Sequence, residues 1–257
     1  MIDFHAHTPG FTRDSTGRPI SPYEPGAFLD YMDVAGIDVS VMLNYQGLLD
    51  GSPDSNDFVA EFISTDPARL IGFGTVNPRL SGAVAETRRM IRDLGLVGMK
   101  VHPWVQGISM MEPEMDRVCD VLEEEGAILL SHDGTPPYSM ATQLAALARR
   151  HPGLPVVLGH GGLLDFWREA IVAAQETPNV YVCVASVNPF AGRMVVERAP
   201  KDKVLFGTDS GLAPDGTQNY ALARVRELAG WGISADDIER ITVTNPLRLL
   251  RQKGIVQ

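Results

Sequence analysis

The chain alternates eight short apolar segments with eight segments of helical spacing, and this alternation constrains the fold more than any other feature. The apolar segments are residues 2–5, 39–43, 70–76, 97–101, 127–131, 155–159, 180–184 and 204–207. The segments with apolar residues three and four apart follow them in turn, at residues 27–35, 55–64, 83–94, 113–124, 140–150, 163–175, 190–197 and 220–229. Strands that are each followed by a helix favour a parallel sheet.

Eight strand–helix units in 257 residues predict an α/β protein built as a single (β/α)8 TIM barrel over residues 1–257. Barrels of this type have about 250 residues, which fits the length of the chain. Residues 234–251 predict two extra C-terminal helices, the first capped by Ser234 and the second beginning at Asn245. Residues 12–26, rich in Gly and Pro, predict a long loop.

Composition excludes several classes of partner. The formal net charge is −10 and no long block of like charges occurs, which argues against binding to nucleic acid or to an anionic membrane. No apolar stretch reaches the length of about 18 residues that a membrane helix needs. Cys119 and Cys183 lie in apolar stretches, as expected of buried thiols. We therefore expect a cytoplasmic protein that acts on a small molecule.

Five of the six histidines lie at the predicted strand ends, where TIM barrels place their active sites. The reactive side chains are His5 and His7 at the first strand, Lys100 and His102 at the fourth, His132 at the fifth, His160 at the sixth and Asp209 at the eighth. His5 and His7 are two residues apart, so they share one face of a strand and can converge on a metal ion. Imidazole and carboxylate ligands suit Zn, with Mn or Fe as alternatives.

The short motifs around these residues resemble the amidohydrolase superfamily. They are Gly-Met-Lys-Val-His-Pro at 98–103, Ser-His-Asp-Gly-Thr-Pro-Pro at 131–137, Gly-His-Gly-Gly at 159–162 and Phe-Gly-Thr-Asp-Ser at 206–210. The resemblance runs from Ile2 to Asn245. It is strongest to the amidohydrolase-related branch, which contains aminocarboxymuconate semialdehyde decarboxylases and pyrone dicarboxylate hydrolases.

The resemblance implies that His5, His7, His132 and Asp209 bind one divalent metal, most often Zn in relatives. It also implies that His160 stands beside a metal-bound water. Asp209 could hold the ion and take a proton from that water, while His160 stabilises charge on a substrate oxygen. The alternative role for Asp209 is a helix N-cap.

Lys100 ends an apolar strand, where an unpaired ammonium would be costly, so it needs a partner. In two-metal relatives a carboxylated lysine at this strand bridges the ions, and the histidines of the fifth and sixth strands hold the second ion. In single-metal relatives the lysine is uncarboxylated and pairs with a ligand Asp or an anionic substrate. We expect one metal. His102 either orders the loop beside the site or reaches the site itself, and Trp104 either walls the pocket or is simply packed.

Loop residues are further candidates for contact with substrate. These residues either meet substrate or are solvated. They are Arg13 and Arg18 in the first loop, and Asn188 and Phe190 after the seventh strand. The glycines of the Gly-His-Gly-Gly motif lack the pattern of a phosphate-binding loop and predict a close approach of backbone around His160 instead.

The constellation predicts a metal-dependent hydrolase in which activated water attacks an amide, lactone or ester-like carbonyl of a small molecule. The alternative is a metal-dependent non-oxidative decarboxylase of a small carboxylic acid. A third hypothesis is a catalytically silent barrel that uses the metal for structure. Relatives are often dimers, so a homodimer is one assembly that the resemblance allows, and the sequence leaves the oligomeric state open.

Overall fold

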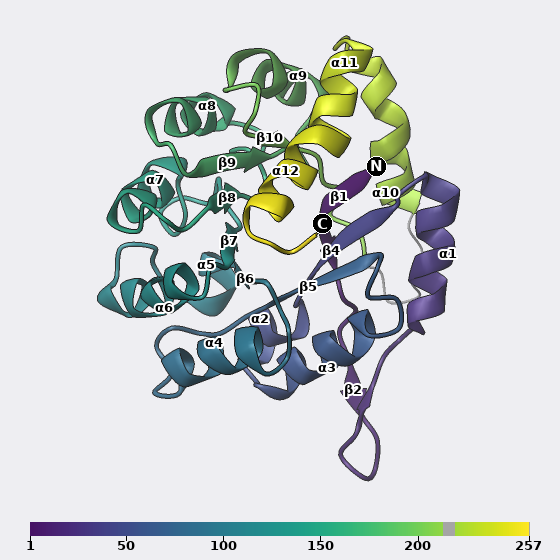
Figure 1. Ribbon diagram of the computed structural model, residues 1–257, viewed down its shortest axis with the longest axis vertical. Helices are drawn as coiled ribbons and strands as arrows, with labels where there is room; N and C mark the ends of the chain where they lie inside the picture. The colour runs from purple at the N-terminus through teal and green to yellow at the C-terminus, as the bar shows by residue number, and fades with distance from the viewer. Residues whose placement is uncertain (213–218, 257) are drawn as a thin grey trace.

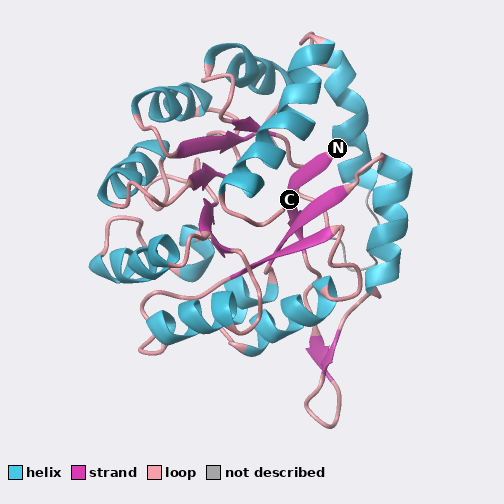
Figure 2. Ribbon diagram, in the orientation of Figure 1, coloured by secondary structure: helices cyan, strands magenta, loops and turns pink. Residues whose placement is uncertain are grey.

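The computed structural model describes residues 1–212 and 219–256, which form an eight-stranded sheet ringed by helices (Figures 1 and 2). The strands are β1 (Ile2–His7), β4 (Val39–Leu43), β5 (Leu70–Gly74), β6 (Gly98–Val101), β7 (Ile128–Ser131), β8 (Val156–Leu158), β9 (Val180–Cys183) and β10 (Val204–Leu205). Each strand pairs in parallel with the next one along the chain. Every strand therefore ends at the same side of the sheet.

Backbone hydrogen bonds between the first strand and the segment after the last one close the sheet into a barrel. The Phe4 N–H donates to the Phe206 carbonyl at 2.9 Å, and the Asp209 N–H donates to the His5 carbonyl at 2.7 Å. Ala6 and Ser210 form a parallel bridge further along. These contacts confirm the predicted TIM barrel and place Asp209 beside the first strand.

One or more helices follow each strand and cover the outside of the barrel (Figure 1). The main ones are α1 (Pro25–Ala35), α3 (Asp54–Ile63), α4 (Ala83–Arg92), α6 (Pro113–Glu124), α7 (Ala141–Arg150), α8 (Trp167–Glu176), α9 (Pro189–Arg198) and α10 (Asn219–Glu227). Helix α8 begins at Trp167 rather than at residue 163, because Gly162 and Leu163 have positive φ angles of 84° and 54° that interrupt a helix.

Several connections are more ordered than the sequence predicts. The first loop contains a two-stranded hairpin, β2 (Thr12–Arg13) and β3 (Pro19–Ile20), which projects from the barrel in Figure 1. Short helices α2 (Gln46–Asp50) and α5 (Pro103–Gln106) follow β4 and β6. A 3-10 turn, η1 (Leu228–Gly230), follows α10.

The C-terminal segment contains the two predicted helices, which a π-helical turn joins into one continuous helical run. It consists of α11 (Ala235–Glu239), a π-helical turn η2 (Arg240–Thr244) and α12 (Asn245–Gln252). Ser234 caps the run as expected, since its side chain accepts the Asp237 N–H at 3.1 Å. Within the π turn the Ile241 carbonyl accepts the Phe206 N–H at 3.0 Å, so this turn is tied to the end of β10.

Helix α12 closes one end of the barrel. Its Leu249 and Leu250 are buried in the same apolar cluster as Ile2, Phe4 and other strand residues of the barrel interior. In Figure 1 this helix lies across the face that carries the N-terminus. The opposite face, where the strands end, holds the candidate site. No described helix is long and apolar enough to span a bilayer.

Candidate metal centre and active site

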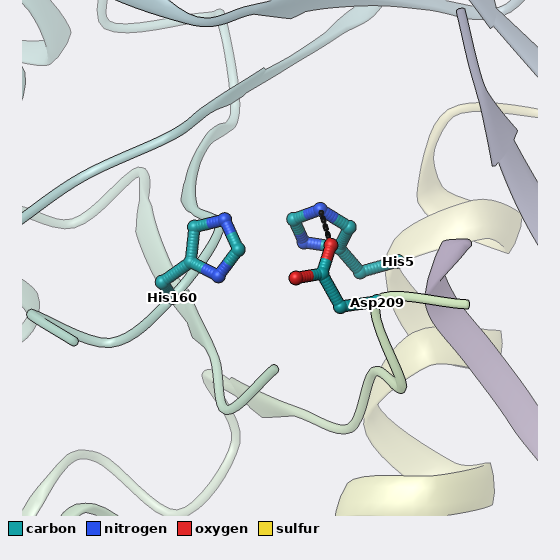
Figure 3. Close-up of side chains that lie close together, drawn as sticks. All are labelled: His5, His160 and Asp209. Atoms are coloured by element: carbon teal, nitrogen blue, oxygen red, sulfur yellow. Dashed lines mark ion pairs between the residues drawn. The ribbon is translucent and has the colours of Figure 1, made fainter. Parts of the chain in front are cut away.

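His5, His160 and Asp209 form a compact group of potential metal ligands at the C-terminal ends of the strands (Figure 3). Their ligand atoms all lie within 4.8 Å of one another. His5 Nε2 lies 3.3 Å and His7 Nε2 lies 3.0 Å from the same oxygen of Asp209, Oδ1. Barrel closure therefore brings Asp209, about 200 residues away in sequence, onto the two histidines of the first strand.

Backbone carbonyls orient two of the imidazole rings. His5 Nδ1 donates to the Gly159 carbonyl at 3.0 Å, and His160 Nδ1 donates to the Ala185 carbonyl at 3.3 Å. Each bond sets the tautomer and leaves the other ring nitrogen free to accept, as is typical of metal-binding histidines. Gly159 makes this possible, because a Cβ there would lie 2.8 Å from the Ser131 carbonyl oxygen and 3.1 Å from the His5 ring. The predicted close approach of backbone around His160 is thus confirmed.

Asp209 is held in an uncommon backbone conformation with φ of 61°. Its second oxygen accepts the Ser186 hydroxyl at 2.7 Å, and Ser186 itself has φ of 59°. Non-glycine residues in this region are strained by about 1–3 kcal/mol and often belong to functional sites. The described carboxylate contacts go to histidines and Ser186 rather than to a helix N-terminus. This pattern is that of a ligand rather than of a helix cap.

The histidines of the site are neutral. Burial lowers the pKa of His102 to about 3 and that of His160 to about 4, and it also lowers the pKa values of His5, His7 and His132. Burial alone would raise the pKa of Asp209, but the hydrogen bond from His7 and the neighbouring histidines hold it well below its usual range. Neutral imidazoles around an ionised carboxylate are the donor set that a divalent metal needs. In addition, His7 Nδ1 is buried without a hydrogen-bond partner. The residues present therefore fit a divalent ion.

The group opens into a cavity of about 280 Å³. Its lining is rich in imidazole and apolar side chains: His7, Tyr45, Leu48, Leu49, Lys100, His102, Val105, His132, His160, Asp209 and Leu212. The His132 ring stacks on that of His102, with centroids 3.8 Å apart, and its centroid lies 4.3 Å from that of His160. His132 therefore lines the cavity beside His160 but lies outside the compact group of His5, His160 and Asp209.

Lys100 is buried at the inner wall of this cavity. Its Nζ lies 3.3 Å from His5 Nε2, and burial lowers its pKa to about 8. The ion pairs of Asp209 in the described residues are with His5 and His7, so a pairing of Lys100 with this carboxylate is not formed. The ammonium is thus directed at the same nitrogen of His5 that faces Asp209.

Trp104 does not wall the pocket. Helix α5 turns its side chain outward, where it is 61% exposed, and the neighbouring Val105 lines the cavity instead. Consecutive helical residues point about 100° apart, which explains why only one of the two faces inward. His102 does line the cavity, and its backbone N–H is held by the Gln106 side chain at 2.8 Å.

The other loop candidates have structural partners away from the cavity. Arg13 forms an ion pair with Asp54 at 2.5 Å, and Arg18 is exposed in the hairpin beside it. Asn188 caps α9 by accepting the Ala191 N–H at 2.9 Å. Phe190 is 63% exposed and packs edge-on against Trp167. These four residues do not line the metal-site cavity, which favours the alternative that they are loop residues without contact to substrate there.

Two buried carboxylates that the sequence reasoning missed support the site from behind. Asp3 accepts the His5 N–H at 3.1 Å and both the N–H and the hydroxyl of Thr208, at 3.0 and 2.5 Å. Asp133 accepts the N–H groups of His160 and Gly162. Burial raises the pKa of Asp3 to about 7 and that of Asp133 to about 6. Their positions in the sequence could have indicated this role, because Asp3 lies within an apolar strand and Asp133 lies just after one.

Comparison with known proteins agrees with this architecture. The model of a family described as Amidohydrolase matches residues 2–252. A 2-amino-3-carboxymuconate-6-semialdehyde decarboxylase from Dictyostelium discoideum is 29% identical over 181 residues, which are 68% of this chain. The match covers only 43% of that relative, so the chain spans less than half of its length.

Two solved structures share the fold at low sequence identity. One is a 5-carboxyvanillate decarboxylase from Novosphingobium aromaticivorans, complexed with manganese and 4-hydroxy-3-methoxy-5-nitrobenzoic acid. It matches with a TM-score of 0.72 and 18% sequence identity, and the match covers 97% of this chain and 96% of the decarboxylase. The other is a probable 2-pyrone-4,6-dicarboxylic acid hydrolase from Acinetobacter baumannii with citric acid bound, with a TM-score of 0.73 and 16% identity over 97% and 98% of the two chains.

Proposed function

The chain belongs to the amidohydrolase family, and we propose that it is a metal-dependent non-oxidative decarboxylase of a small carboxylic acid. The observation that carries the proposal is the cavity itself, in which the ligand group of His5, His160 and Asp209 faces the buried cation Lys100. A carboxylate substrate would find complementary charge there. The 29% identity to a decarboxylase supports this choice over the hydrolase that we expected from the histidine pattern.

We assign the metal to His5, His7, Asp209 and one further imidazole, with His132 as the predicted fourth ligand. Zn and Mn both accept imidazole and carboxylate ligands, and the Novosphingobium decarboxylase is complexed with manganese. A divalent ion in this position would supply Lewis acidity that polarises the carbonyl or carboxylate oxygen of a substrate.

The side chains of the cavity account for the remaining steps. The Lys100 ammonium orients the substrate carboxylate. His160 Nδ1 is engaged with the Ala185 carbonyl, so His160 stabilises charge on a substrate oxygen by taking up a proton at its second ring nitrogen and donating that N–H to the oxygen. The carbon–carbon bond then breaks, carbon dioxide leaves with the carboxylate oxygens, and the bonding electrons stay on the substrate carbon. That carbon must take up one proton, and we propose that Asp209, which is ionised in the free protein, takes this proton from water and transfers it to the carbon.

The test is a panel of aromatic acids, unsaturated acids and lactones, assayed with the metal-loaded protein. We expect release of carbon dioxide from an acid, with one deuterium in the product when the reaction runs in D₂O and no ¹⁸O from labelled water. The variant His160→Ala should lose this activity, whereas His151→Gln, at a histidine outside the cavity, should keep it. Lactone opening with incorporation of ¹⁸O, and without carbon dioxide, would overturn the proposal.

Hydrolysis of a lactone or amide is the second candidate function. It is favoured by the position of Asp209 in the ligand group, where its carboxylate could act as a base toward water. The similarity in fold to the pyrone dicarboxylic acid hydrolase is compatible with it. The same panel separates the two reactions, since only hydrolysis consumes water.

A further inference from the structure

A second, larger cavity of about 490 Å³ adjoins the cavity at the metal site. Tyr45, Leu49 and Leu212 line both spaces, so they form the boundary between the two. The second cavity lies between helix α2 and the segment that leads into and out of the β2–β3 hairpin. Its remaining lining residues are Pro9, Gly10, Phe11, Thr12, Ile20, Ser21, Pro22, Gln46 and Gly211.

The lining of this second cavity is uncharged and mostly apolar. Two of its polar side chains are already engaged with the protein. Gln46 accepts the Phe11 N–H at 3.1 Å and donates to Asp50 at 2.8 Å. The Ser21 hydroxyl donates to the Tyr23 carbonyl. A ligand group in this space would therefore gain mainly from burying apolar surface.

The wall formed by the hairpin segment is tied to the body of the barrel. Besides the bond from Phe11 to Gln46, the Phe11 ring packs on Phe58 of α3 at 5.2 Å between centroids. Arg13 lies over the Phe11 ring and forms an ion pair with Asp54 at the start of α3. These contacts hold the wall in place before any ligand arrives, which reduces the entropy lost on binding.

We propose that the second cavity is the subsite for the part of the substrate remote from the metal, and that it takes an uncharged aromatic or alkyl group. Ligand pockets usually have about 300–1,000 Å³, and the metal-site cavity alone, at about 280 Å³, falls just below that range. The two cavities together place a charged end at Lys100 and an apolar end against Phe11, Ile20 and Leu49. This inference rests on the proposed function, because it assumes a carboxylic acid in the first cavity.

The test compares two probe acids, benzoate and biphenyl-4-carboxylate, by calorimetric titration of the metal-loaded protein. Both present the same carboxylate, but only the second carries a further apolar ring at the end remote from the carboxylate. We expect biphenyl-4-carboxylate to bind about tenfold more tightly or better, since burial of an aromatic ring contributes at least that factor. In Ile20→Asp the preference should disappear while benzoate binds as before, because Ile20 lines only the second cavity.

The matched control is Val172→Asp, on the outer surface of α8. Val172 is 47% exposed and Ile20 is 48% exposed, so both substitutions place a carboxylate at an equally accessible aliphatic position. The subsite is overturned by equal affinity for the two acids, by failure of biphenyl-4-carboxylate to bind, or by an unchanged preference in Ile20→Asp. Because the readout is binding, a protein that shows the preference but releases no carbon dioxide would contradict the proposed reaction and leave the subsite standing.

Discussion

The carboxylate of Asp133 accepts the backbone N–H of His160 at 2.6 Å and, through its other oxygen, the N–H of Gly162 at 2.6 Å. One buried side chain that directly follows His132 in sequence therefore fixes the loop that carries His160. Gly162 has φ of 84°, and a Cβ there would lie 2.3 Å from the backbone of Phe166, so the loop has little freedom to rearrange. The position of His160 thus depends on a residue that does not line the cavity.

We expect Asp133→Ala to destabilise the protein and to lower its turnover. The substitution leaves two buried N–H groups without acceptors, each at a cost of about 1–3 kcal/mol, so the free energy of unfolding should fall by about 2–6 kcal/mol. Asp133→Asn keeps one acceptor oxygen, so its free energy of unfolding should fall by about half as much. Urea unfolding measures the first effect and steady-state kinetics the second. Wild-type stability in Asp133→Ala would contradict this role.

The fourth metal ligand can be identified from the metal content of two variants. We expect His132→Ala to lose most of its metal, because removal of a ligand weakens coordination directly. His160→Ala should retain metal and lose turnover, because it removes a group that acts on the substrate. Elemental analysis after dialysis provides the measurement. The reverse pattern would show that the compact group of His5, His160 and Asp209 is the ligand set.

Lys100 should make metal binding depend on pH. Its ammonium lies 3.3 Å from His5 Nε2, and its pKa is lowered to about 8, so it repels a cation at that nitrogen below this pH and not above it. Metal affinity should therefore rise between pH 6.5 and 8.5, and Lys100→Met should show a weaker rise. Competition titrations with a chelator measure both.

The metal content of the wild-type protein and of Lys100→Met shows how many ions bind per chain. We expect one metal per chain in wild type and in Lys100→Met. Two equivalents in wild type that fall to one in Lys100→Met would instead indicate a carboxylated lysine that bridges two ions.

The metal-free protein should lose stability as the pH falls below about 6.5. The five histidines of the site have lowered pKa values in the folded state, to about 3 for His102 and about 4 for His160. In the unfolded chain the histidines have pKa values of about 6.5. Between about pH 4 and pH 6.5 the unfolded chain therefore binds more protons than the folded protein, and the free energy of unfolding rises with pH. Asp3 and Asp133, with raised pKa values, act in the opposite direction but are fewer.

The variant His102→Phe tests this explanation. It keeps an aromatic ring stacked against His132 and removes one proton-binding group. We expect the slope of the free energy of unfolding against pH to decrease by up to about 1.4 kcal/mol per pH unit between pH 4 and 6.5, the value for one proton. Denaturant titrations at a series of pH values provide the slope. An unchanged slope would mean that His102 takes up a proton equally in both states.

The sequence did not predict how the two C-terminal helices are joined or how the loops are ordered. Periodicity predicted the strands and most of the helices, because one buried face repeats locally every two or every 3.6 residues. It predicted the two helices in residues 234–251 but not the π turn that joins them, whose Ile241 carbonyl accepts the Phe206 N–H. That bond joins segments far apart in sequence, and no local pattern encodes it.

The sequence by itself determined the barrel and the chemical nature of its site. Eight strand–helix units permit few arrangements, and parallel strands put all their C-terminal ends, with His5, His132, His160 and Asp209, on one face. The tertiary structure alone decided which rings converge on Asp209, that Trp104 turns outward, and that a second cavity opens behind Tyr45. These outcomes depend on side-chain rotamers, on strained backbone and on contacts across the barrel, and residue spacing carries no information about them.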